Sequence, residues 1–87
     1  MTAFIFLSLG SFVEMNETEI IVELGRRLKS LRLSNSLTQT DLSFKLGTDE
    51  SYIRKVEKGR VNMKFTSLLN YVNALEADLC EIIQGLV

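Results

Sequence analysis

The chain has 87 residues, 46% of them hydrophobic and 24% charged, with one cysteine, no histidine and no proline. This length allows one small domain, and the composition is typical of globular rather than disordered proteins. A single cysteine without histidine excludes a disulfide scaffold, the common zinc sites and histidine-based catalytic triads, so we expect no metal and no cofactor. The net charge of −1 excludes a uniformly basic nucleic-acid coat but permits a local basic patch.

The first part of the chain, residues 1–16, is predicted to be an extension of a domain that spans residues 17–87. Residues 2–13 are almost all apolar or small, and this segment is too short to span a bilayer. No Lys or Arg precedes it and no convincing cleavage site follows, which disfavours a signal peptide. The segment has strand propensity, with apolar residues on both faces, which suits a buried or dimer-paired strand. Met15 is an alternative start.

From Glu17 onward the pattern predicts five helices. The first runs from Glu17 to a break at residues 34–36, and its apolar residues recur at intervals of three and four, which forms one stripe. The members of this stripe are Ile21, Leu24, Leu28 and Leu31.

The second helix has strong signals at both ends. Thr38 is a good N-cap, Asp41 three residues later is a variant of the capping box, and Gly47 is placed to end the helix in the left-handed conformation. Leu37 and Leu42 occupy the positions of a hydrophobic staple.

The third helix is expected to begin after an Asp49 cap and to end at Gly59. We expect Ile53 and Val56 to be buried, with Tyr52 packed beside them.

Two further helices complete the predicted domain. The fourth carries an apolar stripe made of Phe65, Leu68, Leu69, Val72 and Leu75. The fifth begins at Asp78, with Glu81 completing a capping box, and it carries Leu79, Ile82, Ile83 and Leu86. Cys80 is expected to be a small packing residue on this helix.

Residues 39–58 consist of two short predicted helices joined by a tight turn that contains glycine, which is typical of a helix-turn-helix. The chain here resembles the Cro and phage-repressor family, also called the xenobiotic response element (XRE) family. The matching segments are LGRRLKSLR (24–32), LTQTDLSFKLG (37–47), SYIRKVEKG (51–59) and SLLNYVNAL (67–75). The resemblance implies an all-α, compact five-helix domain of the lambda-repressor type, with a recognition helix at about residues 50–58 in the DNA major groove.

The distribution of charge agrees with this resemblance. Five basic residues lie between positions 54 and 64, against the single acid Glu57, and such a cluster favours phosphate binding through counterion release. The alternative interpretation is a solvated helix face. The residues expected to contact DNA are Thr38, Gln39, Thr40, Glu50, Ser51, Arg54, Lys55, Lys58, Arg60 and Lys64.

The family positions imply separate roles within this set. Gln39, helped by its neighbours, would hold a backbone phosphate, although Thr38 can equally serve only as a cap. Arg54 and Lys55 suit guanine, while Glu50 either accepts from cytosine or stabilises the helix N-terminus. The basic residues from position 58 onward would bind phosphates.

Three further residues depart from the family pattern. Ser43 replaces the usual alanine where the two helices touch, and its hydroxyl can bond back to a helix carbonyl. Met63 replaces a frequent proline. Phe44 is expected to face solvent.

The resemblance also implies an ion pair between Arg32 and Glu57, which would join the first and third helices and turn this acid inward. Because one helix-turn-helix reads few base pairs, we expect a homodimer on an inverted-repeat operator. A chain of this length cannot bury all the apolar residues of its C-terminal end. The predicted dimer interface consists of Leu79, Ile82, Ile83, Leu86 and Val87.

The favoured function is a sequence-specific double-stranded DNA-binding transcriptional regulator in the cytoplasm of a bacterium or phage host, without membrane association. An antitoxin that also captures a toxin, a restriction–modification controller and a protein-interaction module are the alternatives. An enzyme is disfavoured, because the sequence contains no nucleophile–base pair, metal cluster or glycine-rich phosphate loop.

Overall fold

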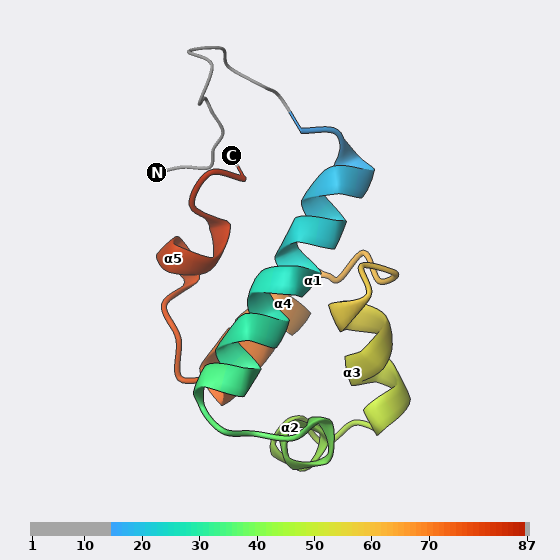
Figure 1. The fold of residues 1–87 in the computed structure, drawn as a ribbon, viewed down its shortest axis with the longest axis vertical. Coiled ribbons are helices and arrows are strands. Elements are labelled where there is room, and N and C mark those ends of the chain that lie inside the picture. The colour runs from blue at the N-terminus through green and yellow to red at the C-terminus, as the bar shows by residue number, and fades with distance from the viewer. Residues whose placement is uncertain (1–14, 87) are drawn as a thin grey trace.

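The structure, a computed structural model, describes residues 15–86; the predicted strand in residues 1–14 and Val87 lie outside the described residues. Five α-helices follow one another within residues 15–86, which confirms the all-α prediction for this part of the chain. They are α1 (Glu17–Ser34), α2 (Gln39–Leu46), α3 (Glu50–Glu57), α4 (Phe65–Ala74) and α5 (Leu79–Ile83). In Figure 1, α1 runs through the centre with α3 on one side and α5 on the other, while α2 lies across its lower end. No helix of residues 15–86 has the length and hydropathy needed to cross a bilayer.

The helix ends around the predicted helix-turn-helix form as expected. The Thr38 hydroxyl accepts from the Asp41 backbone N–H at 3.0 Å, and the Asp41 carboxylate accepts from the Thr38 N–H at 2.9 Å, so the capping box is complete. Asp49 accepts from the Tyr52 N–H at 2.9 Å. Gly47 and Gly59 have φ angles of 68° and 72°, the left-handed conformation that ends a helix.

The core lies where the stripes of α1 to α4 meet. Leu28, Leu42 and Ile53 are completely buried. Tyr71, which the predicted stripe omits, is the largest buried side chain. The inclusion of Phe65 was wrong, because its side chain is 63% exposed. Phe65 begins α4, and since helical side chains tilt toward the N-terminus, it points beyond the end of the core.

Helices α1 and α3 approach each other at backbone distance through two glycines. A Cβ atom on Gly25, in the middle of α1, would lie 2.3 Å from the carbonyl oxygen of Val56. A Cβ atom on Gly59 would lie 2.7 Å from the Cα of Val22. The absence of a side chain at both positions therefore sets the distance between the two helices.

The C-terminal helix differs from its prediction. The Asp78 carboxylate accepts from the N–H of Cys80, two residues on, rather than from Glu81, so the predicted capping box was wrong. Cys80 is exposed instead of packed. Helix α5 ends at Ile83, before Leu86, because Gln84 leaves the helical conformation with a ψ of 126° and Gly85 follows with a φ of 82°. Nη1 of Arg27 in α1 donates to the carbonyl oxygens of Ile82 and Gln84.

Candidate nucleic-acid interface

Helices α2 and α3 pack against each other through buried small and apolar side chains. Leu42 and Ile53 lie in the core between the two helices. Ser43 is 6% exposed, and its hydroxyl donates to the carbonyl oxygen of Thr40 at 2.7 Å, as predicted for a serine at this contact. Together with the left-handed turn at Gly47, this packing is that of a helix-turn-helix.

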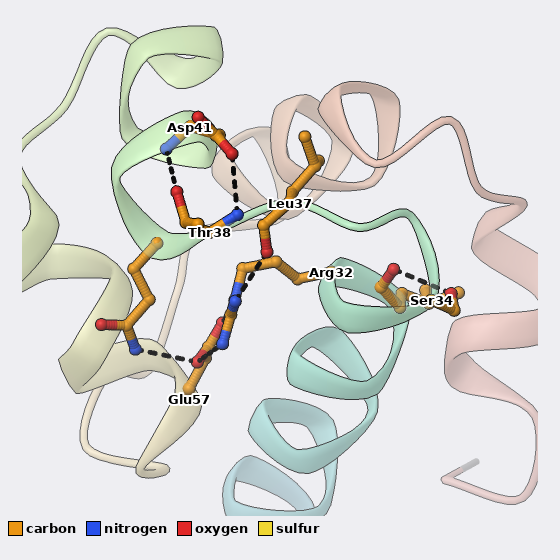
Figure 2. A network of polar contacts seen from close by, with 8 residues as sticks. Arg32, Ser34, Leu37, Thr38, Asp41 and Glu57 are labelled. Carbon is orange, nitrogen blue, oxygen red and sulfur yellow. Dashed lines mark hydrogen bonds and ion pairs between the residues drawn. The ribbon is translucent and has the colours of Figure 1, made fainter.

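A buried ion pair joins the end of α1 to the end of α3. The Nε of Arg32 donates to Oε2 of Glu57 at 2.6 Å and its Nη2 donates to Oε1 at 3.1 Å, which confirms the predicted pair. The two side chains are 7% and 3% exposed. The hydrogen bond to Glu57 raises the pKa of Arg32 above its ordinary value. Figure 2 shows that the guanidinium also donates to the carbonyl oxygen of Leu37, at 2.8 Å, just before α2 begins.

The same carboxylate orients the first residue of α2. Nε2 of Gln39 donates to Oε1 of Glu57 at 3.1 Å, and Gln39 is half-buried. The sequence predicts a phosphate contact for this amide, and the structure shows that its hydrogen bond to Glu57 fixes the orientation of the amide group. The position of α2 relative to α3 is thus fixed by polar contacts that converge on one acid.

Tyr71 lies in the core near this network. Burial raises the pKa of its phenol, and the negative charge of Glu57 adds to the effect. Among the residues that the structure describes, none forms a hydrogen bond with the Tyr71 hydroxyl.

The outer face of α3 carries cations and one acid. Arg54 and Lys55 are exposed. Oε2 of Glu50 accepts from the hydroxyl of Thr40 at 2.6 Å, and its Oε1 lies 3.6 Å from Nη1 of Arg54. The Ser51 hydroxyl donates to the Asp49 carboxylate at 2.9 Å, which couples it to the helix cap.

The segment after α3 continues the basic surface. Lys58, Arg60 and Lys64 are all exposed. Because Glu57 is turned inward and paired with Arg32, the exposed charges between positions 54 and 64 are all positive. This part of the surface therefore favours a polyanion.

The C-terminal residues divide into two groups. Ile82 is 2% exposed and packs in the core of its own chain, so its assignment to a dimer interface is corrected. Leu79, Ile83 and Leu86 are half-buried. An open cavity of about 390 Å³ is lined by Cys80, Glu81, Ile83 and Gln84. Within residues 15–86 no cluster of acidic or cysteine side chains could hold a metal ion.

The geometry thus defines a helix-turn-helix protein. Residues 23–82 match a family described as a helix-turn-helix domain, and the chain belongs to this family. No curated protein sequence matches the chain. The resemblance to regulators of the Cro and phage-repressor type is confirmed.

Solved structures provide three comparisons. The chain is 35% identical to the restriction-modification controller protein C.AhdI from Aeromonas hydrophila, with a TM-score of 0.67, covering 71% of this chain and 94% of that one. It is 27% identical to the controller protein C.Esp1396I, solved as a tetramer with its natural 35 base-pair operator, with a TM-score of 0.70 over 77% and 88% of the chains.

The third comparison, at 23% identity, is with the clp gene regulator ClgR from Corynebacterium glutamicum. Its TM-score is 0.73 over 80% of this chain and 90% of that one, and it supports the fold alone.

Proposed function

We propose that this protein is a transcriptional regulator that binds an inverted-repeat operator as a homodimer, with α3 in the major groove. The burial of Glu57 carries the proposal, because it leaves only positive exposed charges between positions 54 and 64, from the recognition helix onward. An inward acid within a DNA-facing segment avoids repulsion by phosphates. The operator complex of the related C.Esp1396I supports the same function.

The side chains divide into those that position the protein and those that read bases. Gln39, Thr38 and Thr40 lie at the start of α2 and would contact the DNA backbone, where helix N–H groups favour phosphates. Lys58, Arg60 and Lys64 would contact further phosphates.

The base-reading group lies on α3. It consists of Glu50, Ser51, Arg54 and Lys55, of which Arg54 and Lys55 suit the O6 and N7 acceptors of guanine.

Dimerisation supplies a second recognition helix for the second half-site of the operator, which lies about 34 Å from the first. The half-buried side chains of Leu79, Ile83 and Leu86, with Val87 beyond the described residues, form the proposed interface. Replacement of Ile83 with Asp should shift the protein to a monomer while leaving its helix content unchanged. Light scattering at tens of micromolar tests this, and a monomer mass for the unmodified protein would contradict it.

Among the biological settings, a restriction–modification controller is the second candidate. The 35% identity to C.AhdI over most of that protein favours it over an antitoxin role. We also infer that the protein acts as a DNA-binding regulator rather than an enzyme, in the cytoplasm of a bacterium or of a phage host.

The test is selection of bound sequences from a random DNA pool, followed by titrations over a range of salt concentrations. Arg54→Ala and Lys55→Ala should each cost about 1–3 kcal/mol on the selected duplex and relax the preference at particular base pairs. Lys58→Ala and Arg60→Ala should weaken binding to the selected and the scrambled duplex alike. Each should also lower the slope of log affinity against log salt concentration by about one unit. Equal losses on both duplexes for all four variants would instead indicate a protein-interaction module.

A further inference from the structure

Glu50 places a negative charge on the surface that the proposed function turns toward a polyanion. Its side chain is 44% exposed at the first position of α3. A carboxylate at this place repels phosphates and, unless it gains a partner in the groove, weakens DNA binding.

This acid is not the hydrogen-bonding cap of α3, although its charge in the first turn favours the helix N-terminus. The backbone N–H of Tyr52 is already taken by Asp49, which is the N-cap of α3. The carboxylate of Glu50 turns instead to side chains on the outer surface.

Two contacts hold the carboxylate in place. The Thr40 hydroxyl donates to one oxygen at 2.6 Å from the start of α2, and the Arg54 guanidinium lies 3.6 Å from the other, one turn further along α3. All three residues belong to the proposed DNA-facing set. Glu50 therefore connects the start of α2, which is proposed to contact the DNA backbone, with Arg54, which is proposed to read guanine.

We infer that Glu50 is a specificity-determining residue, and this inference rests on the proposed function. In the groove its carboxylate accepts from the exocyclic amino group of a cytosine or an adenine, the hydrogen-bond donors that base pairs present there. A duplex without a donor at that position leaves the acid close to phosphates with no partner on the DNA. Glu50 thus lowers affinity for DNA that offers no such donor.

The test compares Glu50→Gln and Glu50→Ala with the unmodified protein on its selected duplex and on a scrambled duplex. Loss of the charge should tighten binding to the scrambled duplex by about threefold to tenfold, in line with surface charge effects. The ratio of the two affinities should fall by about tenfold or more. A new selection with Glu50→Ala should lose the preference for a cytosine or adenine at one position of each half-site.

Two further variants act as controls. Glu76→Gln removes an 82% exposed acid just after α4, and it should leave the affinity ratio unchanged. Thr40→Val keeps the charge but removes the donor to Glu50, so the ratio should fall without tighter binding to the scrambled duplex.

The outcomes separate the two proposals. If the unmodified protein selects no sequence, the proposed function fails. If it selects a sequence and Glu50→Ala keeps both that sequence and the affinity ratio, the role of Glu50 is overturned while the proposed function stands. Thermal unfolding of each variant shows whether its fold is intact.

Discussion

The two ends of this small domain are held in different ways. Helices α2 and α3 have side-chain caps, a left-handed glycine between them and a buried ion pair that fixes both to α1 (Figure 2). Helix α5 has five residues; it is held by the buried side chain of Ile82 and the guanidinium of Arg27, and its other apolar side chains are half-buried.

This difference matches the tasks proposed for the two regions. A surface that reads base edges requires side chains held in position before DNA arrives, because ordering them on binding would reduce affinity. A surface that pairs with a second copy gains its remaining burial from that copy. The contrast predicts that substitutions near α3 have larger effects on stability than those near α5.

The largest effect is expected for Glu57→Ala. Its removal leaves the buried guanidinium of Arg32 without a counter-charge, which should lower the free energy of unfolding by about 3–5 kcal/mol. Urea denaturation measures the change. Glu76→Ala removes an exposed acid whose ion pair spans 3.8 Å and should cost less than about 0.5 kcal/mol. Similar losses for the two variants would contradict the distinction between buried and surface pairs.

Gly25→Ala should cost about 2 kcal/mol, because the new methyl group would meet the backbone carbonyl of Val56 at 2.3 Å. Helix propensity alone predicts the opposite sign, a gain of about 1 kcal/mol. Gly47→Ala is the matched control: a methyl group there would have no described atom within 4 Å, so its cost of roughly 1 kcal/mol comes only from the positive φ. A stabilised Gly25→Ala variant would show that the two helices can separate freely.

The stability of the fold should be sensitive to acid through Glu23 in α1, which pairs with Arg26 and with Arg27. Hydrogen bonds from Arg26 and Arg27 lower the pKa of Glu23 to about 2, against partial burial, which raises it. Because this pKa is depressed in the folded state, the stabilisation is complete above about pH 4.5 and is lost as the pH falls toward 2.

Glu23→Gln should therefore reduce the stability difference between pH 7 and pH 2.5 by about 1 kcal/mol, after allowance for solvent screening. Denaturation at the two pH values gives this difference, and an unchanged pH dependence would contradict the assigned contacts.

The smallest effect is expected for Tyr71→Phe. A buried hydroxyl without a described hydrogen-bond partner is costly, so its removal should be neutral or stabilise the fold by up to about 1 kcal/mol. The ring remains in the core, and thermal unfolding is a sufficient measurement. A loss of more than about 1 kcal/mol would indicate that the hydroxyl has a partner.

Local signals predicted most of the fold. Thr38 with Asp41, Asp49 and Gly47 act within a few residues of the backbone groups they bind, so the ends of α2 and the start of α3 could be predicted from spacing. Asp78 has the same local pattern with Glu81, yet its carboxylate binds the N–H of Cys80, and α5 is held by Arg27, which lies 55 residues before Ile82 in the chain. Spacing along the chain carries no information on such a contact.

For the candidate site, sequence predicted residue types better than their partners. The pairing of Arg32 with Glu57 followed from the family resemblance. The contacts of Gln39 with Glu57 and of Glu50 with Thr40 did not, because they depend on how α2 and α3 cross. The sequence pattern did not identify Tyr71 as a core residue, because a tyrosine next to polar residues is equally typical of a surface. Its 1% exposure in the structure places it in the core.

The glycine in the middle of α1 also has a consequence for the order of folding. Glycine lowers helix propensity by about 1 kcal/mol relative to alanine, and most helical stability in proteins comes from tertiary packing rather than from propensity. The same residue gives α1 its closest approach to α3. Helix α1 therefore gains much of its stability when α3 is docked on it, so the two helices form and open as one cooperative unit, with a common opening free energy in amide hydrogen exchange.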